Sequence, residues 1–491
     1  MIETWKILTL LATSTLINGV SGKQDKYLTY NGLALTPPLG WNNWATFRCD
    51  VSSDLLLGTA EKIVELGLKD VGYKYVVLDD CWSNGRDSDG ALIVDAEKFP
   101  EGMKDVSDQL HAKGLLFGMY SSAGRWTCAG YEGSLGHEEI DAKCLAAWGV
   151  DYFKYDNCFN DGENGTPLVS YNRYRKMSEA LLNSGRDIVY SLCNWGEDSP
   201  WDWAPTIANS WRIAGDLYDS FDRPDERCPC SGDDYICKLA GFHCSMNNVL
   251  NKAAKYVAKA RPGAWNDLDM LEVGNGGSSD DEYKTHFSLW AAMKSPLMMS
   301  TDVRKLDPAA YTIFTNPAVL AISQDPAGSS VGRIWKRKIS GDENEFGLEG
   351  ELSLWSGSLW GGDQVIALVN TGSKTVEMTA SLSEIFYDNG PGGTADEIRQ
   401  EWDIYDLWGN RMDLTIAEEI ISGKRKVDNS LIYNATEQSY ADGLSQSDPR
   451  LLGKKIGSIK PLGSFSTKVN SHGVGFFRLR KHESVKVKEF L

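Results

Sequence analysis

The stretch Tyr152-Phe-Lys-Tyr-Asp-Asn-Cys158 has the pattern of a short buried strand that ends in polar side chains. Side chains of a strand alternate between its two faces. Lys154 and Asp156 therefore point the same way, and Phe153 and Tyr155 point the other way. A structural salt bridge is the simplest interpretation of such a pair.

A second stretch repeats this arrangement. Asn209-Ser-Trp-Arg-Ile-Ala-Gly-Asp216 ends an apolar run with a basic residue that is soon followed by an aspartate, and Gly215 allows the chain to turn between them. Two strand ends of this kind indicate a functional site rather than an isolated ion pair.

Strand-like runs recur through the first two thirds of the chain, with helical patterns between them. Ser52 or Ser53 can cap the first helix, and later helical patterns cover 103–111 and 138–148. The predicted strands start near Leu39 and continue at 75–80, 115–120, 152–156, 188–193, 209–213, 264–268 and in the 288–300 region. Repeated βα units predict a parallel sheet, and about eight units before residue 325 suit a (β/α)8 TIM barrel.

Polar residues stand at the carboxyl ends of these runs, which share one face in such a barrel and carry its active site. They are Asn42, Asn43, Asp79, Asp80, Tyr120, Asp156, Asn194, Arg212 and Asp267. An open doubly wound sheet would also collect them along one edge. No Gly-rich phosphate loop follows the first strand, however, so a nucleotide-binding sheet has little support.

The pattern changes after residue 325. Short, often alternating apolar runs separated by Gly, Asp and Asn predict an antiparallel β-domain over 326–491, following a catalytic barrel over 23–325. The second domain has no comparable set of strand-end charges, so we expect it to serve packing or assembly.

Composition limits the class of partner. The chain has 68 acidic and 50 basic residues and a net charge of -18. This balance argues against nucleic acid and anionic membranes as partners and favours a neutral ligand. We expect no cofactor and no bound metal ion.

The first 22 residues are predicted to be a signal peptide, with a weakly basic start, the apolar run 7–17 and small residues at 20–22. No later run is apolar and long enough to cross a membrane. We therefore expect a secreted, extracellular protein. Sequons at Asn164 and Asn434 agree with that route and would lie on the surface if glycosylated.

Ten cysteines fit an oxidising compartment. Cys228, Cys230, Cys237 and Cys244 crowd into a polar loop within the insertion 221–247, where disulfides would fix the backbone. Zinc is the alternative, but the spacing of these four residues matches no common zinc pattern.

The two strand ends suggest glycoside cleavage, which needs one ionised carboxylate and one carboxylic acid. We expect Lys154 to lower the pKa of Asp156, which makes Asp156 the better nucleophile. Asp216 precedes the acidic residues Asp219 and Asp222, where a raised pKa would suit the general acid and base. Asp79 and Asp80 could bind sugar hydroxyls, cap a backbone segment or bind a metal ion.

A series of motifs resembles the family 27 glycoside hydrolases, and most closely the secreted fungal α-galactosidases called melibiases. The motifs are Leu35-Thr-Pro-Pro-Leu-Gly-Trp41, Leu78-Asp-Asp-Cys-Trp82, Tyr120-Ser-Ser-Ala-Gly124, Thr127-Cys-Ala-Gly-Tyr131, Lys154-Tyr-Asp-Asn-Cys158, Ser191-Leu-Cys-Asn-Trp195, Asn209-Ser-Trp-Arg212, Trp265-Asn-Asp-Leu-Asp269 and Ser471-His-Gly-Val474. The resemblance covers essentially the whole chain after residue 22.

This resemblance implies a retaining exo-α-galactosidase that acts on melibiose, raffinose-type sugars and other terminal α-galactosides. It implies Asp156 as nucleophile and Asp216 as acid/base. The resemblance implies that the substrate-binding residues are Trp44, Asp79, Asp80, Tyr120, Cys128, Lys154 and Arg212. We expect Trp195 to contact the substrate as well. The implied disulfides are Cys49–Cys81, Cys128–Cys158, Cys228–Cys244 and Cys230–Cys237, which leaves Cys144 and Cys193 as free thiols. Fungal relatives also suggest a homo-oligomer.

One departure bears on specificity. Many relatives have Glu after the Cys of the fifth strand, where it contacts the sugar's 2-hydroxyl, whereas this chain has Asn194 followed by Trp195. A bulky Trp195 should disfavour a 2-acetamido group, which makes α-N-acetylgalactosaminidase the second choice of enzyme. A catalytically silent galactose-binding lectin is the alternative from another class, but binding alone does not require both Asp156 and Asp216.

Overall fold

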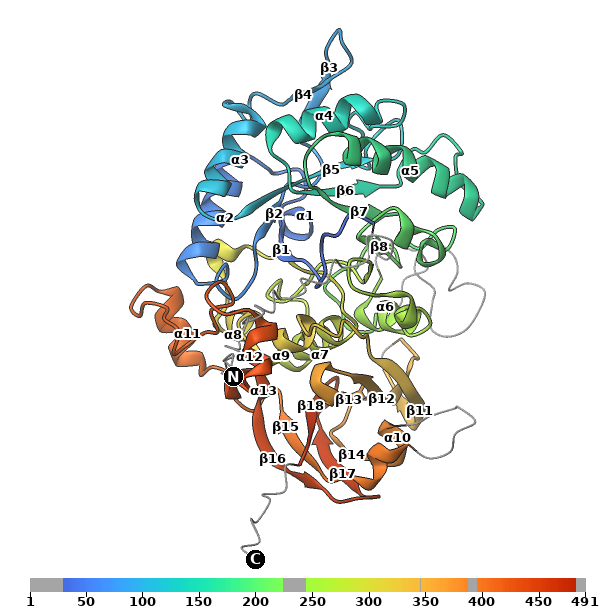
Figure 1. The fold of residues 1–491 in the computed structure, drawn as a ribbon, viewed down its shortest axis with the longest axis vertical. Helices are drawn as coiled ribbons and strands as arrows, with labels where there is room; N and C mark the ends of the chain where they lie inside the picture. The colour runs from blue at the N-terminus through green and yellow to red at the C-terminus, as the bar shows by residue number, and fades with distance from the viewer. Residues whose placement is uncertain (1–29, 224–243, 345, 387–394, 483–491) are drawn as a thin grey trace, which may run out of the picture.

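The computed structural model describes residues 30–223, 244–344, 346–386 and 395–482. The predicted signal peptide over 1–22 lies outside the described residues. So does most of the predicted disulfide-rich loop, together with Cys228, Cys230 and Cys237. Figure 1 shows a barrel-like part in blue to yellow, above a sheet-rich part in orange and red.

Eight parallel strands form the barrel and confirm the predicted fold class. In spatial order they run β10-β1-β2-β5-β6-β7-β8-β9. A parallel bridge between Leu271, just after β9, and Met299 of β10 joins the two edges. The strands are β1 (Leu39–Asn42), β2 (Tyr75–Val77), β5 (Leu116–Ser122), β6 (Tyr152–Asp156), β7 (Val189–Cys193), β8 (Ser210–Arg212), β9 (Trp265–Asp267) and β10 (Leu297–Met299).

Helices connect successive barrel strands and cover the outside of the barrel. Ser52 accepts a hydrogen bond from the Leu55 backbone N–H and caps the first long helix, as predicted. The helices are α1 (Trp44–Phe47), α2 (Ser53–Glu65), α3 (Gly102–Ala112), α4 (Glu138–Trp148), α5 (Pro167–Asn183), α6 (Met246–Ala253), α7 (Asp280–Ala292), α8 (Pro308–Phe314) and α9 (Pro317–Ser323). A hairpin of β3 (Ser83–Arg86) and β4 (Leu92–Val94) extends from the β2–α3 connection. None of the described helices is both long enough and apolar enough to span a membrane.

The predicted strand in the 288–300 region was wrong in its first half. Ser288 to Ala292 belong to α7, and only Leu297–Met299 pair as a strand. Ser279 and Glu282 form a reciprocal cap that starts this helix. Because nearly every residue from Tyr283 onward is buried, the helix shows no apolar stripe by which to recognise it.

Strand β6 carries the decisive stretch at the centre of the sheet. Gly149 ends α4 with a φ of 83°, a left-handed conformation that glycine adopts without strain, and the chain then enters β6. Lys154 pairs with Tyr120 of β5 and with Ser191 of β7. This register places Lys154 and Asp156, at the carboxyl end of β6, beside the carboxyl ends of β5 and β7.

The C-terminal part is an antiparallel domain, as predicted. Its main sheet has the order β11-β12-β13-β18-β15-β16, and a second sheet pairs β14 with β17. Its strands are β11 (Gly332–Glu343), β12 (Glu349–Ser358), β13 (Gln364–Asn370), β14 (Val376–Ser381), β15 (Trp402–Asp406), β16 (Lys454–Ile459), β17 (Ser464–Val469) and β18 (Val474–Lys481). Its helices are α10 (Leu382–Ile385), α11 (Leu414–Ile421), α12 (Tyr440–Ser445) and α13 (Pro449–Leu452).

Two apolar cores hold this domain in place. Leu354, Ile366 and Phe477 belong to a core shared by the two sheets. Trp355, Val365 and other residues of the main sheet join the large core of the barrel. Figure 1 shows α7, α8 and α9 between the barrel strands and the antiparallel sheet. The β-domain therefore packs directly on barrel helices.

Candidate active site

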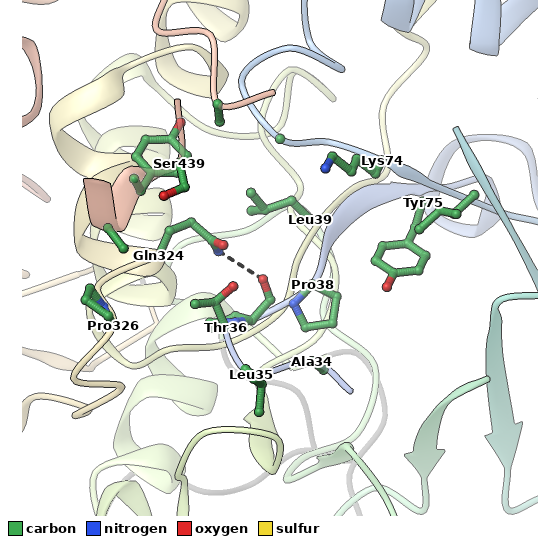
Figure 2. Close-up of a pocket in the computed structure, with 16 residues that line it drawn as sticks. Ala34, Leu35, Thr36, Pro38, Leu39, Lys74, Tyr75, Gln324, Pro326 and Ser439 are labelled. Atoms are coloured by element: carbon green, nitrogen blue, oxygen red, sulfur yellow. Dashed lines mark hydrogen bonds between the residues drawn. The ribbon is translucent and has the colours of Figure 1, made fainter. Parts of the chain in front are cut away.

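Two cavities lie at opposite ends of the barrel, and their linings distinguish them. One of about 470 Å³ lies at the starts of β1, β2 and β5, and Figure 2 shows its lining with the hydrogen bond from Gln324 to the Pro37 carbonyl. The described residues that line it include Lys74 and Tyr75 but no Asp or Glu. This described lining therefore offers no paired carboxylates for glycoside cleavage.

The other cavity, of about 410 Å³, lies beyond the carboxyl ends of the strands. Trp44, Asp216, Asp219, Asp269 and Glu272 are among its lining residues. Burial raises the pKa of the Glu272 carboxyl to about 8, so this side chain is largely protonated at neutral pH. This is the end of the barrel at which the sequence predicted the site.

Asp79 and Lys154 form one buried cluster at the centre of this face. The Lys154 ammonium donates a hydrogen bond to Asp79 Oδ2 at 2.8 Å, and the Asn42 amide donates to the same oxygen at 2.7 Å. The ammonium also lies 5.2 Å from the centre of the Tyr120 ring. Burial acts to lower the pKa of Lys154, but Asp79 and other nearby acidic groups hold it above its ordinary value.

Asp156 lies beside this cluster and is 6% exposed. Its carboxylate accepts hydrogen bonds from the Tyr120 hydroxyl at 3.0 Å and from the Asn157 backbone N–H at 2.9 Å. Burial raises the pKa of Asp156 to about 7, against the opposing effect of Lys154, and the charge of Asp216 raises it further. The prediction that Lys154 would leave Asp156 with a lowered pKa is therefore wrong, because desolvation outweighs the ammonium.

The loop after β6 is fixed from behind by α5. Arg173 is 1% exposed and donates hydrogen bonds to the Asn157 side chain at 2.6 Å and to the Ala123 carbonyl at 2.9 Å. The Tyr174 hydroxyl donates to the Asp156 carbonyl at 3.1 Å. These contacts hold the chain at Asp156 and Asn157 and join it to Ala123, just after β5.

A disulfide adjoins the Asp156 carboxylate. Cys128 and Cys158 are bonded, and their sulfurs and a carboxylate oxygen of Asp156 lie within 4.8 Å of one another. Because both sulfurs are in the disulfide, neither is a thiolate available to a metal ion. Asp80 accepts a hydrogen bond from the Ala129 backbone N–H at 2.9 Å, which ties the segment around Cys128 to the loop after β2.

Asp216 lies on the loop after β8, with its side chain 48% exposed. Arg212, at the end of β8, places one guanidinium nitrogen 3.2 Å from Asp216 and 2.8 Å from Asp269. Asp269 also accepts a hydrogen bond from the Leu217 backbone N–H at 2.7 Å. Asp269 therefore orients both the arginine and the loop that carries Asp216.

Two acidic residues that follow Asp216 in the chain, Asp219 and Asp222, accept hydrogen bonds from other segments. Asp219 accepts hydrogen bonds from the Tyr283 hydroxyl and the Gly277 backbone N–H, each at 2.5 Å. Asp222 accepts one from the Asn344 amide at 2.8 Å. Both carboxylates are thus engaged with other segments of the chain.

The structure brings most of the predicted site residues to this face. Trp44 lines the cavity with Asp216, while Asn194 and Trp195 follow the end of β7, and Trp195 is half-buried with a φ of 58°. Asn194 donates its amide to the Glu197 carbonyl at 2.8 Å. Sequence reasoning missed Asp269, although the second Asp of Trp265-Asn-Asp-Leu-Asp269 was the available signal.

The remaining cysteines follow the implied pattern where they are described. Cys49 and Cys81 form a second disulfide, and Cys144 and Cys193 are free. Cys244 is also disulfide-bonded, and its predicted partner Cys228 lies outside the described residues. These bonds are consistent with an oxidising compartment.

A (β/α)8 barrel with carboxylates, an arginine and a lysine gathered at its carboxyl end is the architecture of a barrel hydrolase. The family model described as "Alpha galactosidase A" matches residues 36–325. The model for the "Alpha galactosidase C-terminal beta sandwich domain" matches residues 349–428. The chain belongs to this family, the α-galactosidases of glycoside hydrolase family 27.

Curated relatives and solved structures agree with this assignment. An α-galactosidase of Zygotorulaspora mrakii is 54% identical over 96% of this chain and 99% of its own length. The structure of a Saccharomyces cerevisiae α-galactosidase with raffinose has a TM-score of 0.90 and 54% identity, covering 92% of this chain and 99% of that one. α-Galactosidase I of Mortierella vinacea has a TM-score of 0.76 and 42% identity, covering 91% and 98%.

Proposed function

We propose that the chain removes terminal α-galactose from melibiose, raffinose-type oligosaccharides and other α-galactosides by double displacement. The observation that carries this proposal is that Asp156, at the end of β6, and Asp216, on the loop after β8 and lining the cavity, lie close enough for the charge of Asp216 to act on Asp156, in a chain of this family. Raffinose in the structure of the yeast relative supports an oligosaccharide substrate.

In the first step, Asp156 attacks the anomeric carbon while Asp216 protonates the leaving oxygen. In the second step, Asp216 removes a proton from water, and that water displaces Asp156 from the galactosyl-enzyme. The side chain of Asp156 is almost fully buried. Asp216 is half-exposed and faces the cavity, through which a leaving group and water can pass. This difference in exposure suits a nucleophile and an acid/base.

The other groups on this face bind and orient the sugar. Asp79, Asp80, Lys154 and Arg212 present charged donors and acceptors for its hydroxyl groups. The Tyr120 hydroxyl and the Asn157 backbone N–H each donate to one oxygen of Asp156 and so orient its carboxylate for attack. Trp44, Trp195 and the disulfide of Cys128 shape the walls of the pocket. The residues present require no metal ion or cofactor for these steps.

Secretion, cleavage after residue 22 and glycosylation of Asn164 and Asn434 belong to the same proposal. Both asparagines are partly exposed. The proposal also includes the boundary between barrel and β-domain near residue 325, the pairing of Cys228 with Cys244 and of Cys230 with Cys237, and assembly into a homo-oligomer.

A proton NMR time course with p-nitrophenyl α-galactoside tests the mechanism. Release of α-galactose before mutarotation is the expected result, because two inversions restore the configuration. Initial release of β-galactose would contradict double displacement. Binding of galactose without turnover would favour the lectin, and faster turnover of the 2-acetamido substrate would favour α-N-acetylgalactosaminidase.

A further inference from the structure

We infer that the β-domain positions the acid/base loop of the barrel, and that His472 is the positioning residue through which it does so. This inference rests on the proposed role of Asp216. It concerns the Ser471-His-Gly-Val474 motif, which lies in the turn between β17 and β18 and contributes no group to the pocket described above.

The loop after β8 continues from Asp216 to Phe221 and Asp222, where it meets the β-domain. The His472 ring stacks on the Phe221 ring with 4.7 Å between centroids and 17° between planes. The Asn344 amide, next to the end of β11, donates to Asp222 at 2.8 Å. Two separate turns of the β-domain therefore contact the same short piece of the barrel loop.

The same histidine also contacts the start of α7. His472 Nδ1 lies 2.6 Å from Glu282 Oε1, and the Thr285 hydroxyl donates to the His472 carbonyl at 2.9 Å. Glu282 at the same time completes the cap of α7 by accepting from the Ser279 backbone N–H at 2.7 Å. His472 thus joins Phe221 of the β8 loop to Glu282 of the helix.

The start of α7 in turn holds the middle of the β8 loop. Asp219 accepts hydrogen bonds from Tyr283 of α7 at 2.5 Å and from the Ser278 hydroxyl at 2.8 Å. Asp219 stands three residues after Asp216 in the chain. The loop is therefore fixed at Asp219 by the start of α7, and at Phe221 and Asp222 by the β-domain. His472 of the β-domain contacts both the loop and α7.

The backbone of His472 gives an independent reason to assign it a role. Its φ is 53°, in the left-handed region that non-glycine residues rarely occupy. Such a conformation persists where the surrounding structure holds it in place, and it is common at functional positions. Packing alone would be met by glycine or asparagine at this turn, neither of which supplies a ring for Phe221 and a donor for Glu282.

A displaced Asp216 has a specific kinetic signature. General acid catalysis matters for a leaving group that must be protonated, such as the sugar alkoxide of raffinose, and matters little for fluoride. We expect His472→Ala to lower kcat/KM for raffinose about tenfold, since small misplacements of a catalytic group cost up to about a hundredfold. Its kcat/KM for α-galactosyl fluoride should change less than about twofold.

His482 provides a matched control within the same domain. It also pairs with a carboxylate, since its Nδ1 lies 2.9 Å from Asp403 Oδ1, but this pair involves only the β-domain. His482→Ala should therefore leave kcat/KM for both substrates unchanged. His472→Gln, which keeps a donor for Glu282, should recover part of the loss on raffinose. Asn344→Ala tests the second contact and should reproduce a smaller, equally selective loss.

Equal loss on both substrates, no loss on either, or the same effect from His482→Ala would overturn the inference. If His472→Ala does not fold, Asn344→Ala and His472→Gln decide between the same outcomes. Failure of the proposed function is distinguishable, because the wild-type chain would then hydrolyse neither raffinose nor α-galactosyl fluoride, or Asp216→Asn would show no dependence on the leaving group.

Discussion

Lys154 of β6 pairs at 2.8 Å with Asp79, which follows β2 two strands away in the sheet, rather than with Asp156 two residues away in its own strand. The ammonium therefore neutralises a residue proposed to bind the sugar, and it acts on the proposed nucleophile only through space. This separation explains how Asp156 can keep a raised pKa beside a buried cation. Lys154 should therefore affect two measurable quantities, the pKa of Asp156 and the stability of the folded chain.

Replacing Lys154 by Met should raise the pKa of Asp156 further, because it removes the main charge that lowers it. Asp156 must be ionised to attack, so the acidic limb of the kcat/KM profile should move to higher pH. The variant should also lose about 3 kcal/mol of stability, since Asp79 is left buried without its cation. A pH series with an aryl α-galactoside and a denaturant titration measure the two effects.

Lys104→Met is the matched control, because Lys104 pairs with Asp108 on the surface with both side chains more than half exposed. It should alter neither quantity. An acidic limb that stays in place or moves to lower pH in Lys154→Met would contradict the assigned electrostatics of Asp156.

Replacing Asp156 by Ala should reduce kcat by at least about 10³-fold, because the covalent intermediate can no longer form. Galactose binding, measured by calorimetry, should persist. Added azide should then restore turnover of an activated aryl α-galactoside and yield β-galactosyl azide, since azide attacks the face that Asp156 vacates. Asp161→Ala, which removes an exposed partner of Arg125, is the control. An α-configured azide would contradict the role of Asp156 as nucleophile.

The fold could be predicted because its determinants are local. The run in β6, the cap at Ser52 and the strand-end polar residues each depend on a few neighbouring positions, and the barrel follows from their repetition. Helix α7 was partly misassigned because burial on nearly all sides removes the period that marks a helix.

The site could be predicted only in part, because its energetics depend on contacts between distant segments. Sequence spacing placed Lys154 and Asp156 on one face but could not show that Asp79 takes the ammonium. Desolvation of Asp156 likewise depends on the packing of several strands. His472 lies 256 positions after Asp216 in the numbering, so no local pattern connects them.

Replacing Asp216 by Asn should separate substrates by their leaving groups. We expect kcat/KM for raffinose to fall about 10² to 10⁴-fold, because the sugar leaving group requires a proton. Hydrolysis of α-galactosyl fluoride should slow far less in its first step. Parallel kcat/KM measurements on the two substrates test this, with Asp202→Asn on the surface as control. Equal losses would indicate a structural role for Asp216.

Removing the disulfide that adjoins Asp156 should affect both stability and turnover. Cys128 and Cys158 are 30 positions apart, and closing a loop of this length contributes about 3 to 4 kcal/mol to stability. The double variant Cys128→Ser with Cys158→Ser should lose that amount in denaturant titrations. It should also lose activity at temperatures where it remains folded, since both sulfurs adjoin the carboxylate of Asp156. Full activity in the folded variant would show that the disulfide does not shape the pocket.

The contact between the domains should depend on pH through His472. Burial acts to lower the pKa of His472, but the hydrogen bond and charge of Glu282 and the charges of Asp222 and Asp342 outweigh it, so the net pKa lies above its ordinary value. A raised pKa means that the folded chain holds this proton more tightly than the unfolded chain does. The contribution to stability is thus complete below about pH 6.5, the unfolded value, and is lost as pH rises through the folded pKa.

The Tm difference between wild type and His472→Phe, which keeps a ring against Phe221, should therefore be largest at low pH and should shrink above neutrality. Because the side chain is 26% exposed, we expect a shift on the order of 1 °C. A Tm difference that is constant from pH 5 to 8, or that grows with pH, would contradict a charged His472 at the junction.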